Sequence, residues 1–133
     1  MGDTRSPDEI PNLWPEDLLD EQMLSPKAIM DRQAAMFTER TGGRLTGTVL
    51  TRVLGRDFSH TMYIVAPALG DYQYFLLRIR HPVDALFPLR VSVVERDDGG
   101  EECGDLRGFV LTLRGVLNEQ TTRELVRVLL AQS

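Results

Sequence analysis

The fold is decided by residues 44–80, which read RLTGTVLTRVLGRDFSHTMYIVAPALGDYQYFLLRIR. This stretch contains three runs rich in β-branched and aromatic residues, at about 44–54, 60–66 and 72–80. In the first run the apolar positions alternate with polar ones: Leu45, Val49 and Val53. A period of two is typical of a strand with one buried face. Because only 55–59 and 67–71 separate the runs, the strands are expected to be antiparallel neighbours.

The flanking sequence predicts a fourth strand and three helices. The segment 89–96 (LRVSVVER) continues the alternation, so we expect a four-stranded, mainly antiparallel sheet. Ser25-Pro26 is a strong helix start and Gly42-Gly43 a strong stop, which predicts a helix over 26–41. Two more helices are expected over 105–117 and 119–131. All three are predicted to pack on one face of the sheet, giving an α+β fold.

The segment 105–117 has two interpretations. Apolar residues recur at helical spacing, and Asp105 is placed to cap a helix. Gly108 and Gly115 each cost a helix about 1 kcal/mol relative to alanine. A fifth strand over 108–113 is therefore the alternative, although the spacing favours the helix.

The chain has 133 residues, a common size for one domain. We expect an acidic, proline-containing arm over 1–24 and a single α+β domain over 25–133. Residues 1–25 contain seven acidic residues and one arginine. Trp14, the only tryptophan, lies in this arm. An arm that carries a tryptophan is expected to dock on its own body or on a partner.

Composition narrows the classes of function. The formal net charge is −5, so we expect neither nucleic acid nor an anionic membrane as a partner. No apolar run approaches the roughly 20 residues needed to cross a bilayer. Cys103 is the only cysteine, which excludes an internal disulfide and favours a cytoplasmic location. Fourteen arginines against one lysine fit a GC-rich bacterial genome.

The standard signatures of phosphate-binding loops, dinucleotide-binding folds, zinc proteases and serine hydrolases are absent from the sequence. Two histidines and one cysteine are too few for a typical zinc site, so we predict no metal and no cofactor. The acidic turn 97–102 lacks the alternating ligand spacing of a calcium-binding EF-hand loop. No catalytic residue is assigned, and a non-enzymatic role is favoured.

One face of the predicted sheet is polar and rich in arginine. Continued alternation places on this face Thr46, Thr48, Arg52, Tyr74, Arg78, Arg80, Arg90 and Ser92. Guanidinium groups and aromatic rings are typical of protein-binding surfaces. A surface for single-stranded nucleic acid is less well supported, because no RNP-like aromatic motif is present. A solvated face with cross-strand ion pairs is the simpler alternative.

The segment 80–88 (RHPVDALFP) places reactive residue types between two strands. His81 is the best candidate for acid–base chemistry, with Asp84 to orient it or Cys103 as a nucleophile. In the simpler interpretation, Pro82 holds His81 extended at a strand end. Arg78, Arg80 and His81 are then predicted to form one basic cluster at that end of the sheet.

These features favour a small cytoplasmic bacterial protein that binds another protein without catalysis, as immunity proteins, secretion chaperones and adaptors do. The order of helix, strands and helices is similar to that of secretion chaperones and related dimeric α+β modules, a likeness of layout alone. The predicted binding residues are Trp14, Arg52, Arg78, Arg80, His81 and Arg90. One alternative is a small enzyme or ligand-binding domain that uses His81 with Arg78 or Arg80 in a pocket at the strand end. Another is a homodimer formed through an edge strand or the terminal helix.

Overall fold

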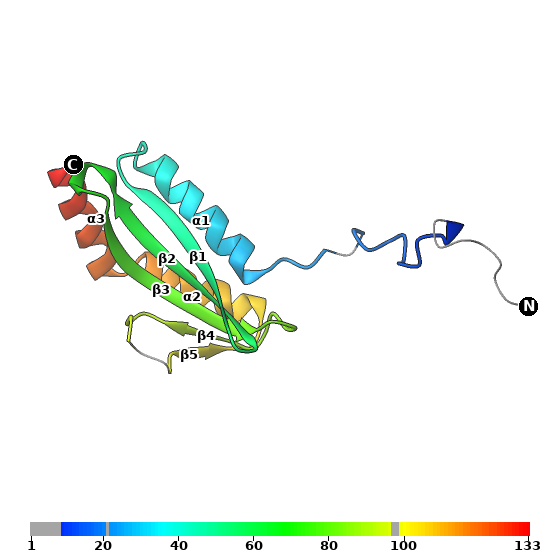
Figure 1. The fold of residues 1–133 in the computed structure, drawn as a ribbon. Helices are drawn as coiled ribbons and strands as arrows, with labels where there is room; N and C mark the ends of the chain where they lie inside the picture. Colours follow the sequence, from blue (N-terminus) through cyan, green and yellow to red (C-terminus); the bar gives the residue numbers. More distant parts are fainter. Residues whose placement is uncertain (1–8, 21, 97–98) are drawn as a thin grey trace, which may run out of the picture.

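A computed structural model of the chain describes residues 9–20, 22–96 and 99–133. Its elements, shown in Figure 1, are α1 (Pro26–Arg40), β1 (Thr46–Leu54), β2 (Asp57–Ala66), the 3-10 turn η2 (Pro67–Leu69), β3 (Tyr72–Pro82), β4 (Leu89–Ser92), β5 (Glu101–Cys103), α2 (Leu106–Leu117) and α3 (Gln120–Gln132). Residues 1–8 and 21 of the predicted arm, and 97 and 98 of the predicted acidic turn, lie outside the described residues. Within the described ranges, no helix is long and apolar enough to cross a membrane.

The strands form one antiparallel sheet in the order β1-β2-β3-β4-β5, which confirms the α+β prediction. Two strand predictions need correction. The fourth strand ends at Ser92 rather than at residue 96, and the end of the predicted acidic turn is a fifth strand, β5. Val93 and Val94 are more than half exposed, because the chain leaves the sheet after Ser92. It returns at β5, where Cys103 is buried opposite Leu89.

A bulge in β3 changes which side chains face the helices. Met62 and Tyr63 are consecutive in β2, but their partners in β3 are two residues apart, so Leu76 is an extra residue. An extra residue shifts the alternation of a strand by one position. Tyr74, predicted on the polar face, therefore packs against the core instead, and Phe75 takes the outer face. The sequence prediction for Tyr74 was wrong for this reason.

All three helices pack against one face of the sheet and enclose a single core. α1 lies against β1, and α2 lies against β5. The buried apolar side chains of this core include Met30, Ala34, Leu45, Met62, Ile64, Leu77, Ile79, Leu89, Val91, Phe109, Leu113 and Leu129. Arg44 donates a 2.5 Å hydrogen bond to the carbonyl of Leu130, which ties the C-terminal end of α3 to the start of β1.

α1 lies close to β1 at Gly47. The Gly47 amide donates to Thr38 Oγ1 over 2.9 Å, and Thr38 Oγ1 donates to the Ala34 carbonyl over 3.1 Å. A Cβ atom at position 47 would lie 2.7 Å from the Ala34 carbonyl oxygen. Glycine therefore sets the distance between helix and sheet.

The segment 105–117 forms the helix α2, as its periodicity favoured. The Asp105 carboxylate accepts a 2.8 Å hydrogen bond from the Gly108 amide, and Phe109 and Leu113 are buried. Burial of the apolar face thus outweighs the cost of two glycines.

We expect Asp105→Ala to lower the free energy of unfolding by about 1 kcal/mol, because the Gly108 amide loses its acceptor. Asp105→Asn keeps an acceptor and should stay close to the wild type. Urea denaturation of the three proteins measures the difference. An alanine variant as stable as the asparagine variant would contradict a stabilising cap.

Candidate functional site

The face of the sheet opposite the helices carries a row of arginines. The strand register aligns Arg52 with Ser59, Ser59 with Arg80, and Arg80 with Arg90. Arginines from β1, β3 and β4 thus lie in one line across the sheet, and all three are exposed. Arg78 lies on the same face, two residues before Arg80. The structure therefore brings the four predicted arginines together.

The same face carries apolar and aromatic groups. Leu50 and Leu54 flank Arg52 on its side of β1 and are 50% and 42% exposed. Tyr63 and Phe75 pack edge to face, with ring centroids 6.3 Å apart. We call this surface the bare face, and it consists of Leu50, Arg52, Leu54, Tyr63, Phe75, Arg78, Arg80 and Arg90.

Three of the four arginines have hydrogen-bond partners, and the Arg90 guanidinium donates to the Gly99 carbonyl over 3.4 Å. Arg78 donates to Thr61 Oγ1 over 3.1 Å and to the Glu95 carbonyl over 3.0 Å, and its guanidinium lies 5.3 Å from the Phe75 ring centroid. Arg80 forms a 2.8 Å ion pair with Asp57. Because this pair is partly exposed, we expect it to orient Arg80 more than to stabilise the fold.

Long side chains cover the short ones on the bare face. Ser59, Thr61 and Ser92 are less than a tenth exposed, although their strand positions point away from the helices. The arginine residues beside them in the register have long aliphatic stems that can cover a surface while the charged head reaches water. The bare face is thus a layer of arginines over small polar residues.

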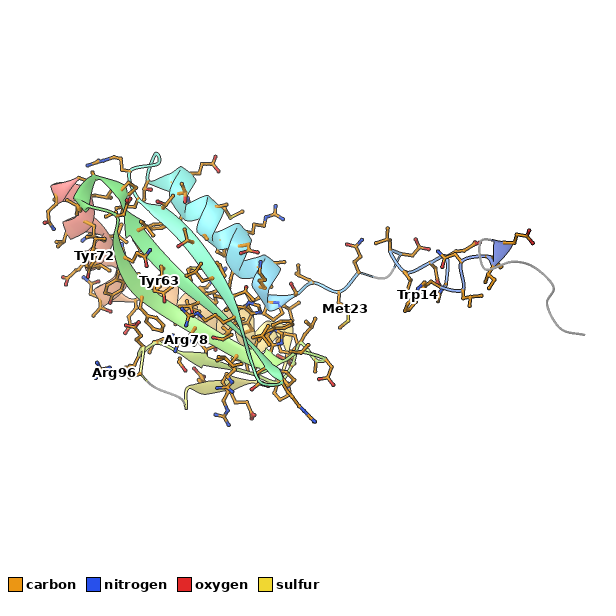
Figure 2. The ribbon with its side chains drawn as sticks, viewed as in Figure 1. Trp14, Met23, Tyr63, Tyr72, Arg78 and Arg96 are labelled. Carbon is orange, nitrogen blue, oxygen red and sulfur yellow. The ribbon has the colours of Figure 1, made fainter. Side chains whose placement is uncertain are left out.

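The other two predicted binding residues lie elsewhere. Trp14 is on the N-terminal arm, away from the sheet and helices (Figure 2), and its side chain is 72% exposed. His81 follows Arg80 in β3, so its side chain points to the helix-covered side, where it is 5% exposed. The structure therefore does not bring Arg78, Arg80 and His81 together as one basic cluster.

His81 contacts the other histidine of the chain. Its Nε2 lies 3.1 Å from Nε2 of His60 in β2. His60 Nδ1 lies 2.8 Å from Thr51 Oγ1, and His81 Nδ1 lies within 2.9 Å of the carbonyl oxygens of Pro82 and Ala85. This chain of contacts links β1, β2, β3 and the connection after β3.

The carbonyl oxygens of Pro82 and Ala85 determine where the protons of the two histidine rings lie. Carbonyl oxygens only accept, so His81 Nδ1 carries a proton and, in the neutral ring, Nε2 accepts from His60 Nε2. His60 Nδ1 then accepts from the Thr51 hydroxyl. Burial lowers the pKa of His60 from 6.5 to about 4, with a further lowering by His81. His60 is therefore neutral at pH 7, with each ring nitrogen engaged.

Sequence reasoning missed the partner of His81. Asp84 is exposed, and Cys103 lies 3.6 Å from Thr112 Oγ1. The available signal was strand parity, because His60 and His81 fall on inward positions of neighbouring strands. Every buried side-chain nitrogen and oxygen in the described part of the chain has a hydrogen-bond partner. The histidine pair thus has the character of a closed structural network.

The described residues hold no group of three or more histidine, cysteine, aspartate or glutamate side chains that could bind a metal ion. No protein-family model, curated protein or solved structure matches the chain. The function is therefore inferred from the surfaces of the molecule itself.

Proposed function

We propose that this chain is a non-enzymatic protein-interaction module that binds its partner through the bare face. The observation that carries the proposal is the row of Arg52, Arg80 and Arg90 on a sheet face that none of the described helices covers. Arginine and aromatic residues supply much of the binding energy of protein interfaces. A cytoplasmic, bacterial setting forms part of the proposal and is supported by the single cysteine and the arginine-rich composition.

The contacts of the bare face indicate what its partner offers. Guanidinium groups bind carboxylates through paired hydrogen bonds, so the partner surface is expected to carry Asp or Glu side chains. Leu50 and Leu54 require apolar side chains beside them. Because Arg78 and Arg80 are already oriented, binding costs less side-chain entropy than it does for free arginines.

The shape of the surface favours a folded protein over a small molecule. Small-molecule sites are concave, whereas the bare face is one side of an open sheet. β1 lies at the edge of the sheet, and among the described residues no strand pairs with its outer side. The alternative enzyme hypothesis gains no support from the geometry, since His81 and Arg80 face opposite sides of the sheet.

The proposal is tested in two steps with the full-length protein. A binder captured from the producing cells is identified and purified, and its affinity for variants is then measured by calorimetry. Arg52→Glu/Arg90→Glu is expected to weaken binding at least about 10-fold, because it places two negative charges opposite the carboxylates of the partner.

The matched control is Arg32→Glu/Arg107→Glu, which makes the same change in net charge on exposed positions of α1 and α2. This control should bind within about 2-fold of the wild type. Equal losses in both variants would indicate a general charge effect and would contradict the proposal. Unchanged binding by the bare-face variant would do the same.

A further inference from the structure

A groove runs along α1 on the helix-covered side of the sheet. Its larger part is a cavity of about 480 Å³ between α1, the sheet and α3. A second cavity of about 220 Å³ lies between α1 and α2, and both are lined by Gln33, Leu117 and Asn118. Two adjoining cavities form an elongated site, which suits a peptide segment better than a compact ligand.

The groove combines apolar walls with positive charge. Met36 and Phe37 of α1, Leu76 of the β3 bulge and Val126 of α3 line the larger cavity. The charged residues that line it are Arg40, Arg123 and Arg127, and no carboxylate does. All three arginines are exposed, and none of their guanidinium groups forms a hydrogen bond or an ion pair with another described residue. The groove is therefore complementary to a segment that is both acidic and apolar.

The N-terminal arm has this character. Trp14, Leu18 and Leu19 are 72%, 59% and 78% exposed. Glu16, Asp17 and Asp20 lie between and beside them, and residues 9–24 contain no basic residue. The hydrogen bonds of the described arm residues stay within the arm, such as Trp14 N to Asn12 Oδ1 over 3.0 Å. Such apolar exposure is typical of a segment that binds a surface.

The direction of the arm favours the groove of another molecule. Ser25 precedes Pro26, which restricts it to the extended conformation that it adopts, with φ −86° and ψ 149°. The chain therefore leads away from the start of α1 rather than back along it (Figure 1). A return to its own groove would require the chain to reverse its direction before Ser25.

We propose that the groove binds the N-terminal arm of a second copy of this chain. Trp14, Leu18 and Leu19 insert against the apolar walls, while Glu16, Asp17 and Asp20 meet Arg40, Arg123 and Arg127. Two copies that exchange arms bury both grooves and form a closed two-fold dimer. This inference is independent of the bare face, which lies on the other side of the sheet.

The only tryptophan of the chain makes the exchange measurable. In the full-length protein, the fluorescence of Trp14 should shift to shorter wavelength as the concentration rises, and light scattering should show the mass doubling over the same range. Two charge-reversal variants test the pairing. One is Arg40→Glu/Arg123→Glu/Arg127→Glu in the groove, and the other is Glu16→Lys/Asp17→Lys/Asp20→Lys in the arm.

Each variant alone should dimerise at least about 10-fold more weakly than the wild type, because like charges then face each other. An equimolar mixture should recover dimerisation. In the mixture, the wild-type arm of one molecule meets the wild-type groove of the other, and the lysine arm meets the glutamate groove. Thermal melts confirm that each variant is folded, and the neutral Arg40→Gln/Arg123→Gln/Arg127→Gln variant should show an intermediate loss.

Three results would overturn the inference. A monomer at all concentrations, with Trp14 either exposed or buried independently of concentration, indicates a free arm or an arm docked on its own body. Folded variants that fail to recover dimerisation on mixing indicate no exchange. A dimer that is lost in Arg52→Glu/Arg90→Glu but kept in the groove variant places the arm on the bare face.

Discussion

Replacing Gly47 with alanine is expected to lower the free energy of unfolding by about 2 kcal/mol. The new Cβ would lie 2.7 Å from the carbonyl oxygen and 2.8 Å from the Cα atom of Ala34, which are backbone atoms of α1. Backbone atoms of a helix cannot rotate away as a flexible side chain can. α1 must therefore move outward, which weakens the hydrogen bond between Gly47 and Thr38 and loosens the packing of Ala34.

Gly115→Ala is the matched control. Gly115 lies in α2, where a Cβ would meet no atom within 4 Å. Alanine is favoured over glycine in a helix interior, so this variant should gain about 0.5–1 kcal/mol. Urea denaturation and thermal melting of both variants measure the two opposite effects. An alanine at position 47 that leaves stability unchanged would contradict the contact between α1 and β1.

The sequence predicted the elements of this fold better than their faces. The two ends of α1 and the start of α2 were predicted closely, because Ser25-Pro26, Gly42-Gly43 and Asp105 act through local contacts. The bulge at Leu76 carries no local signal, since it arises from how β3 pairs with β2. It reversed the predicted faces of Tyr74 and Phe75. Short β5 was missed because its three residues are held by pairing with β4.

The candidate surfaces also differ in how far the sequence predicts them. Alternation alone grouped Arg52, Arg78, Arg80 and Arg90, since strand parity is readable in the sequence. The groove arginines could not be grouped, because Arg40 and Arg127 come from helices at opposite ends of the chain. Their proximity depends on helix packing, which follows from long-range contacts. The contact of His81 with His60 was not predicted, although both histidines have the correct parity. Alternation indicates the face of each residue but not the register between two strands.

The histidine pair should make the protein less stable in mild acid. The pKa of His60 is lowered from 6.5 to about 4. Burial is the largest cause, followed by the charges of His81 in β3 and Lys27 in α1, whereas Asp31 in α1 raises the pKa. In the unfolded chain His60 therefore becomes protonated near pH 6.5, whereas in the folded chain it stays neutral until about pH 4. The contribution of His60 to the free energy of unfolding is therefore fully present above pH 6.5 and is lost as the pH falls towards 4.

Because of His60, the free energy of unfolding should fall by about 1.3 kcal/mol between pH 7.5 and 5.5, and by about 3 kcal/mol in total below pH 4. The upper window separates histidine from carboxylates, whose usual pKa values lie near 4. Urea denaturation at both pH values gives the loss for the wild type. In His60→Gln the protein should be less stable at pH 7.5 but should lose less on acidification, because the titrating group is gone.

Direct titration of the two imidazole rings by NMR separates this cause from others, since the chain has only two histidines. A folded-state pKa of His60 near 6.5 would refute the prediction, because no proton would then be refused on folding. The neutral pair requires the proton order from Thr51 through His60 to His81 and the carbonyls of Pro82 and Ala85. A proton added to His60 goes to Nδ1, because its Nε2 already carries the proton that it donates to His81. His60 Nδ1 then no longer accepts from the Thr51 hydroxyl, so this contact between β1 and β2 should change in acid before the contacts of His81 with the carbonyls of Pro82 and Ala85.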